Sequence, residues 1–147
     1  MMVDETDVQI LELLLADARL SSRQIARRLD VSVGTVLGRI KRMEREGVIR
    51  GYSAVLNHEK LGYELTVVTE IMVSKGKLLE MEREVAKWST VCCVYDVTGE
   101  TDAVVIAKFH GREELSGFTK RLLSLPFVER ANTHVVLTTV KESLNLL

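Results

Sequence analysis

Residues 32–46, with the sequence Ser-Val-Gly-Thr-Val-Leu-Gly-Arg-Ile-Lys-Arg-Met-Glu-Arg-Glu, constrain this chain more than any other stretch. Ser32 is a favoured helix N-cap and Gly47 a favoured C-terminal stop, so the stretch predicts a helix. At about 100° per residue its apolar side chains fall on one arc, which we expect to face a core. That arc comprises Val33, Val36, Leu37, Ile40 and Met43. The opposite arc is basic, and its members are Gly34, Thr35, Gly38, Arg39, Lys41, Arg42 and Arg45.

Gly34 and Gly38 decide how the basic face is interpreted. Basic residues alone are compatible with simple exposure to solvent. A glycine inside a helix, however, costs roughly 1 kcal/mol relative to alanine, so two of them on one face indicate a close approach to the backbone. A groove of duplex DNA makes such an approach, and we interpret the helix as a DNA-binding element.

The charge distribution supports this interpretation. Between Arg19 and Arg50 there are nine Lys or Arg residues against three Asp or Glu, an excess of +6. Between Leu61 and Leu147 there are ten against twelve, and the whole chain has a net charge of −1. This asymmetry indicates that one part meets a polyanion, while the chain as a whole is not a basic nucleic-acid coat.

Two further helices are expected before this one: residues 4–18, capped by Asp4 or Thr6, and a short helix opened by Ser21 or Ser22. Asp30 lies where the chain must turn, and aspartate tolerates the left-handed conformation. Two short helices joined by such a turn form a helix-turn-helix, although three amphipathic helices also pack together without DNA. In this motif the second helix enters the major groove. We expect Val33, Gly34, Thr35, Gly38 and Arg39 near the bases, Arg23, Arg27, Arg28, Lys41, Arg42 and Arg45 at phosphates, and Ser32 among the DNA-binding residues as well.

After Gly62 the pattern changes. The sequence predicts strands at 65–73, 91–98, 103–109 and 128–141, with helices at 77–88 and 112–125 and a hairpin turn at 99–102. The order βαββαβ is the ferredoxin-like arrangement, in which one sheet face stays open, and a partner subunit is the simplest cover for it. We therefore predict an α+β chain: a three-helix helix-turn-helix domain over 1–50, a β-strand hinge over 51–62 and a ferredoxin-like domain over 63–147.

Several classes of protein are disfavoured. No leader and no apolar run of about 18 residues is present, so we expect neither secretion nor a membrane partner but a cytoplasmic protein. Adjacent Cys92 and Cys93 are expected to be small buried hydrophobes in a reducing compartment. His58, His110 and His134 lack metal-ligand spacing, and we expect no metal and no cofactor. An enzyme, or the regulatory subunit of one, is disfavoured because no nucleophile–base pair or phosphate loop is found.

The motifs together resemble those of the Lrp/AsnC (feast/famine) transcription regulators, over essentially the whole chain. In the first half the matching runs are Asp17-Ala18-Arg19, Ile25-Ala26, Val31-Ser32, Thr35-Val36, Arg39-Ile40-Lys41-Arg42-Met43-Glu44, Gly47-Val48-Ile49, Gly51-Tyr52 and Leu61-Gly62. In the second half, Gly99-Glu100-Thr101-Asp102 matches the Gly-x-x-Asp turn of the family, and Thr133 matches a threonine of its last strand. Asp30 departs from the usual glycine of the family, and Gly34 and Gly38 are not typical of its recognition helices.

The resemblance implies a DNA-binding regulator that dimerises through its second domain and often assembles further, commonly to octamers. It also implies an effector, usually an amino acid, bound between dimers by Gly99, Thr101, Asp102 and Thr133. Asp102 has the charge to pair with an α-ammonium group, although Gly99 and Asp102 are also favoured residues of a plain hairpin turn. The leading hypothesis is a sequence-specific regulator of double-stranded DNA modulated by such an effector. The alternative is a non-specific architectural DNA-binding protein without one.

Overall fold

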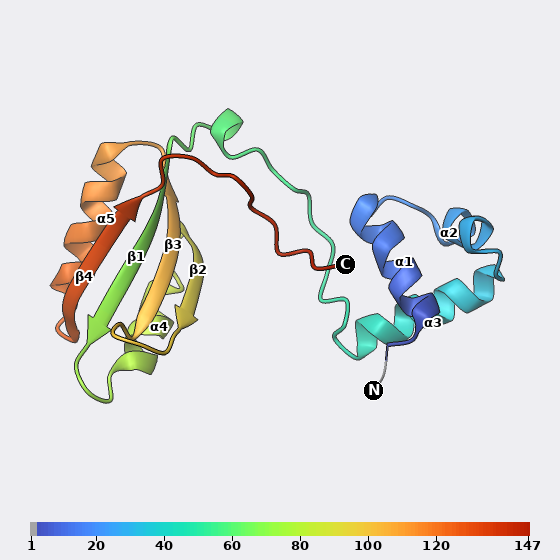
Figure 1. Cartoon of the computed structure of the whole chain (residues 1–147), viewed down its shortest axis with the longest axis horizontal. Helices are drawn as coiled ribbons and strands as arrows, with labels where there is room; N and C mark the ends of the chain where they lie inside the picture. Colours follow the sequence, from blue (N-terminus) through green and yellow to red (C-terminus); the bar gives the residue numbers. More distant parts are fainter. Residues whose placement is uncertain (1–2) are drawn as a thin grey trace. The chain divides into compact units, whose positions relative to one another are not determined.

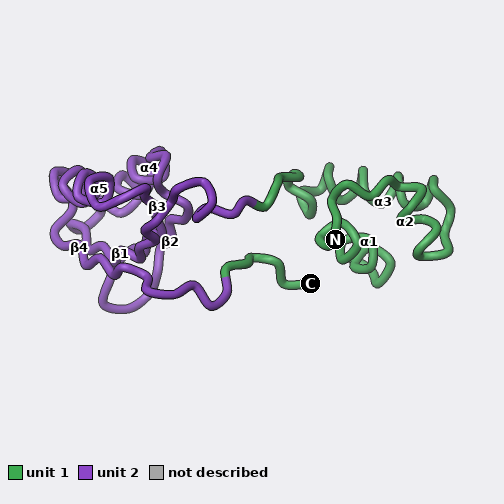
Figure 2. Tube along the Cα trace, turned by 90° about the horizontal axis from the view of Figure 1, so that it is seen from above, with its two compact units in different colours: residues 1–55, 142–147 green, residues 56–141 purple. Residues whose placement is uncertain are grey.

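The computed structural model describes residues 3–147 and separates them into two compact units, coloured separately in Figure 2. Unit 1 takes the chain up to residue 55 together with residues 142–147, and unit 2 takes residues 56–141. Unit 1 holds only helices, whereas unit 2 holds a sheet with helices (Figure 1). The expected α+β class, a helix-turn-helix followed by a ferredoxin-like unit, is confirmed.

Unit 1 contains α1 (Glu5–Ala16), α2 (Ser22–Leu29) and α3 (Val33–Arg45). Each helix begins at a side-chain cap, supplied by Asp4, Ser21 and Ser32 respectively, which satisfies an amide that the first turn leaves unpaired. The three helices enclose a small core, which consists of Ile10, Leu14, Ile25, Ala26, Val36 and Met43.

The inward arc of α3 differs from the one predicted. Val36 and Met43 are buried, but Val33 and Leu37 keep 38% and 43% of their surface exposed. The buried arc is rotated because Arg39 and Arg42 bind carboxylates of α1 and so lie beside the core. Hydrophobic periodicity alone does not register such ion pairs.

The predicted β-strand hinge over 51–62 is wrong in its secondary structure, since those residues form no strand. Just before it, the amides of Val48 and Ile49 bind the Met43 carbonyl and so extend the end of α3. Near its end, a 3₁₀ turn, η1 (Glu59–Leu61), replaces the extended chain. A β-rich composition yields a strand only where a neighbouring strand offers backbone partners, and this stretch has none.

Unit 2 contains β1 (Leu65–Val73), α4 (Leu78–Val85), β2 (Val91–Asp96), β3 (Ala103–Phe109), α5 (Arg112–Ser124) and β4 (Val128–Val135). The strands form one antiparallel sheet in the order β2-β3-β1-β4, which is the ferredoxin-like order. The last strand ends at Val135, six residues before its predicted end, because the final backbone bond to β1 joins Val136 to Thr66.

One face of the sheet is covered by α4 and α5 (Figure 1). Alternate residues of β1, such as Val67 and Ile71, point into the core that these helices close, together with Phe109, Phe118 and Leu122. The residues between them point to the other face, which no element of unit 2 covers. This second face is called the outer face below.

The two cysteines are less buried than expected. Cys92 is exposed and Cys93 is partly exposed, and no disulfide joins them. They lie on β2, an edge strand of the sheet, where neighbours shield a side chain from one direction only. Within residues 3–147, no helix combines the length and the apolar character needed to cross a membrane.

Candidate nucleic-acid interface and effector site

The turn between α2 and α3 is fixed by local chemistry. Asp30 adopts the left-handed conformation, with φ 53° and ψ 45°, as expected for this position. Ser32 then accepts a hydrogen bond from the Thr35 amide at 3.0 Å, and the two hydroxyl groups lie 2.8 Å apart. The first turn of α3 therefore presents a rigid pair of hydroxyls at the end of the helix where the amides point outward.

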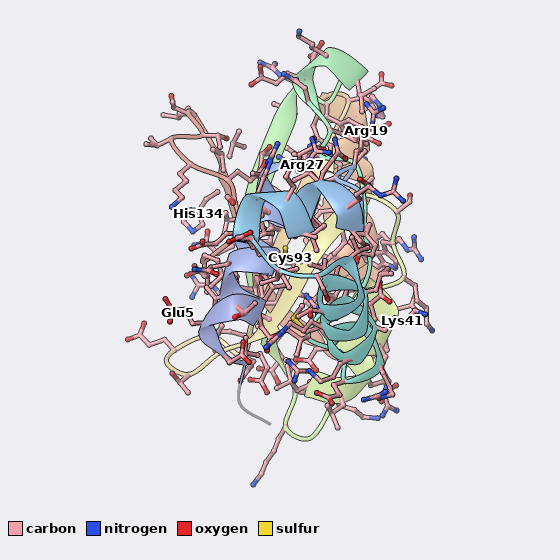
Figure 3. The ribbon with its side chains drawn as sticks, turned by 90° about the vertical axis from the view of Figure 1, so that its right-hand side faces the viewer. Glu5, Arg19, Arg27, Lys41, Cys93 and His134 are labelled. Carbon is pink, nitrogen blue, oxygen red and sulfur yellow. The ribbon has the colours of Figure 1, made fainter. Side chains whose placement is uncertain are left out.

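Most of the residues expected near the bases lie on the open side of α3. Gly34, Gly38 and Lys41 are exposed at intervals of three and four residues and form a ridge that also includes Val33 and Leu37. We call Val33, Gly34, Leu37, Gly38 and Lys41 the outer ridge. Lys41 projects from α3 into solvent (Figure 3).

Arg39 and Arg42 are placed differently from the rest of the predicted set. The Arg39 guanidinium binds the carboxylates of Asp4 at 2.6 Å and Asp7 at 2.9 Å, and Arg42 also binds Asp7. The hydrogen bond from Arg39 lowers the pKa of Asp4, and the same bond raises the pKa of Arg39. Both arginines therefore tie α3 to the start of α1.

The cations of α2 have no such partners. Arg23, Arg27 and Arg28 are exposed, and among residues 3–147 none of them forms an ion pair; the same holds for Lys41. Arg27 lies on the visible side of α2 in Figure 3. These four charges are available to an external polyanion without first giving up an internal one.

In unit 2 the predicted turn at 99–102 is fastened to the end of β1. The Thr101 hydroxyl donates to the Ile71 carbonyl at 2.9 Å, and Asp102 accepts from the Val73 amide at 2.8 Å. Gly99 has φ +123°, a conformation that side chains rarely adopt. The side chains of Thr101 and Asp102 thus hold the loop in place.

Thr133 is separated from the turn. It faces the helix side of the sheet, where its hydroxyl lies 2.9 Å from that of the buried Thr69. The structure therefore does not bring the four predicted effector residues together in one cavity: only Thr101 borders the hollow beside the turn.

That hollow is a cavity of about 400 Å³ on the outer face, which we call the turn cavity. It is lined by Glu70, Met72, Thr98, Glu100, Thr101, Arg130 and Asn132. Glu70 accepts hydrogen bonds from Asn132 at 3.2 Å and from His134 at 3.3 Å, and these bonds lower its pKa. The lining of the cavity therefore combines the carboxyl groups of Glu70 and Glu100 with the guanidinium group of Arg130.

The sequence reasoning missed six of the seven lining residues. Glu70 and Met72 alternate with core residues on β1, as Arg130 and Asn132 do on β4, and Glu70 pairs with Asn132 across the two strands. The alternation could have identified outer-face residues on each strand, but not which of them meet.

The chain combines an exposed helix, nearby cations without ion-pair partners, and a sheet that carries a charged cavity. This combination is typical of DNA-binding regulators with a separate ligand-binding unit. Comparison with known proteins refines that class. Residues 3–50 match the family described as winged helix-turn-helix DNA-binding, and residues 66–146 match the Lrp/AsnC ligand binding domain.

Relatives and solved structures agree with these matches. The chain is 51% identical, over 99% of both sequences, to an uncharacterised HTH-type transcriptional regulator of Pyrococcus furiosus. It is 30% identical to a transcriptional regulator from Neisseria meningitidis solved in complex with L-Met, with a TM-score of 0.90 over 99% of this chain and 97% of that one. A feast or famine regulatory protein from M. tuberculosis complexed with L-methionine is 25% identical, with a TM-score of 0.86 over 98% of each chain. The chain belongs to the Lrp/AsnC family of helix-turn-helix transcriptional regulators, as its motifs had indicated.

Proposed function

We propose that this regulator reads a specific DNA site as a homodimer, with α3 in the major groove, and that a free amino acid bound in the turn cavity modulates it. The observation that carries the DNA part is the outer ridge of α3, exposed beside four cations without internal partners. In this proposal Ser32, Val33, Gly34, Thr35 and Gly38 lie nearest the bases, while Arg23, Arg27 and Lys41 contact phosphates. Arg39 and Arg42 contribute by holding α3 in position.

The DNA part is tested by binding to a duplex selected from random sequence. Lys41→Ala removes one phosphate contact from each protomer, so we expect affinity to fall about equally on specific and random duplexes and the salt slope of the dimer to fall by about 2. Fluorescence anisotropy at several salt concentrations measures both. Lys120→Ala, an exposed lysine of α5, is the matched control and leaves the slope unchanged. An unaltered slope for Lys41→Ala would contradict the placement of α3.

The same measurement separates a regulator from an architectural protein. A sequence-specific regulator binds its selected site roughly 10³-fold or more tightly than random DNA at the same salt concentration. A ratio near one would favour non-specific architectural binding instead.

The effector part rests on the charges of the turn cavity. Glu70 and Glu100 suit an α-ammonium group, Arg130 suits an α-carboxylate, and Met72 adds apolar surface for a side chain. The volume of the turn cavity, about 400 Å³, is in the range of small-molecule binding sites. Two regulators of similar structure are complexed with L-methionine, which makes this amino acid the first ligand to test.

Calorimetric titration with L-methionine and a panel of other amino acids tests the cavity. Arg130→Gln removes the carboxylate partner, and we expect binding to weaken at least tenfold. The control Arg112→Gln changes an exposed arginine at the start of α5 and should bind normally. Binding that survives Arg130→Gln would place the effector elsewhere.

Asp102 is tested separately, because its carboxylate holds the loop. Asp102→Asn keeps an oxygen that accepts from the Val73 amide, whereas Asp102→Ala does not. If Asp102 positions the loop, the asparagine variant retains effector binding and the alanine variant loses it. Equal loss in both variants would assign Asp102 to the α-ammonium group directly.

A further inference from the structure

The outer ridge of α3 carries an apolar side chain at its centre. Leu37 is 43% exposed and Val33 is 38% exposed, and neither is one of the buried residues that form the core of unit 1. Gly34 and Gly38 flank Leu37, and Lys41 follows one turn later. The ridge therefore carries two exposed aliphatic side chains, two glycines and one lysine.

Packing inside the protein does not account for this ridge. A Cβ built at Gly38 would meet no atom within 4 Å, and one built at Gly34 would meet only the Ser32 hydroxyl, at 3.8 Å. Alanine would fit at both positions and would favour the helix. An exposed leucine also lacks the favourable free energy that its side chain would gain on transfer from water to an apolar environment. The ridge becomes favourable only when a partner covers it.

The charges around the ridge indicate the chemistry of that partner. Lys41 stands on the ridge, and Arg23, Arg27 and Arg28 are exposed on α2, which packs against α3, so this part of unit 1 suits a polyanion. Of the long donors on α3, Arg39 already binds Asp4 and Asp7, whereas Lys41 stands on the ridge itself. The ridge therefore offers apolar contact at its centre and one ammonium group at its end.

We propose, on the basis of the DNA-binding function proposed above, that Leu37 and Val33 recognise the C5-methyl groups of thymine. That methyl is the apolar group that a base pair presents in the major groove. Gly34 and Gly38 let the backbone come close enough for the short Val33 and Leu37 side chains to reach it, and Lys41 binds a flanking phosphate. The half-site read by α3 accordingly contains thymines at the positions beneath the ridge.

Replacing thymine by uracil tests this assignment, because it removes the methyl group and leaves every hydrogen-bonding group in place. Duplexes of the selected site are compared with duplexes in which the half-site thymines are uracils. We expect the unmodified protein to lose about fourfold in affinity for each methyl group that it buries. Leu37→Ala should lose less affinity on uracil substitution, by the share of the effect that Leu37 contributes, so that the two changes are not additive.

Leu15→Ala is the control variant, since Leu15 is 44% exposed on α1 of the same unit. It should keep the full loss on uracil substitution. Circular dichroism verifies that both variants fold. Two results would overturn the assignment. The unmodified protein could bind the thymine and uracil duplexes equally tightly, or Leu37→Ala could retain the full loss of affinity on uracil substitution.

Two other outcomes are distinguishable from these. If Leu37→Ala changes the oligomeric state and leaves the uracil effect intact, the ridge is a contact between protein chains and the assignment is wrong. If the unmodified protein binds no selected duplex at all, the proposed function itself fails and this inference with it.

Discussion

Asp7 shows how one buried charge can organise a small unit. Its carboxylate is fully buried, accepts from Arg39 and Arg42 of α3, and also completes the capping box with Asp4 at the start of α1. Removing this carboxylate leaves the partly buried guanidinium groups of Arg39 and Arg42 without the anion that they share.

We therefore expect Asp7→Ala to lower the free energy of unfolding of unit 1 by about 2–4 kcal/mol. Urea unfolding followed by circular dichroism measures the change. Glu5→Ala, an exposed acid two residues earlier on α1, is the control and should change stability by less than about 0.5 kcal/mol. Equal stability of the two variants would show that the ion pairs do not hold α3.

Single residues also show where sequence reasoning succeeds and fails. The left-handed Asp30 and the capping Ser32 were predictable, because both are local properties of the chain. The partners of Arg39 lie 32 and 35 residues earlier, and nothing in the sequence pattern links them. The helical wheel places Arg39 on the arc opposite the core, whereas in the structure it binds the carboxylates of Asp4 and Asp7.

At the scale of elements, Gly38 lowers the intrinsic helix stability of α3. Alanine at this position has room in the protein, so we expect Gly38→Ala to raise stability by about 0.5–1 kcal/mol. The same methyl group stands where the backbone approaches DNA, so affinity for the selected duplex should fall at least severalfold. Thermal unfolding and anisotropy measure the two effects.

Gly117→Ala in α5 is the matched control, since a Cβ there also meets nothing within 4 Å. It should raise stability by a similar amount and leave DNA affinity unchanged. A Gly38→Ala variant that gains stability and keeps full affinity would argue against a close approach at this position.

An element was predicted well where its own sequence indicates the elements that it packs against or pairs with. The sequence pattern predicts the observed bounds of β1 and β3, because the inward residues of these central strands are apolar except for Thr69. The hinge strand and the last residues of β4 were mispredicted, since their composition favours strands but no neighbour completes a ladder. The turn cavity depends on the pairing of β1 with β4, which sequence alone does not specify.

At the scale of the whole molecule, the outer face of the sheet is suited to a second copy of the chain. Val104 and Ile106 point to this face from β3, and Tyr95 from β2 is 44% exposed. A homodimer through this face would bury them. Assembly beyond the dimer, to an octamer for example, remains a prediction.

Ile106→Glu places a charge at the centre of that face, and we expect it to convert the dimer to a monomer. Light scattering coupled to size-exclusion chromatography measures the mass. Leu79→Glu, at an exposed leucine of α4 on the covered side of the sheet, should leave the dimer intact. A dimer that persists in Ile106→Glu would require another interface.

The cap at Asp4 has a practical consequence for these measurements. This side chain begins α1 and binds Arg39 of α3, the helix that we propose to contact DNA. A purification tag fused just upstream brings additional charged groups next to that carboxylate, and a basic tag competes with Arg39 for it. Affinities are therefore best compared on protein from which an amino-terminal tag has been cleaved.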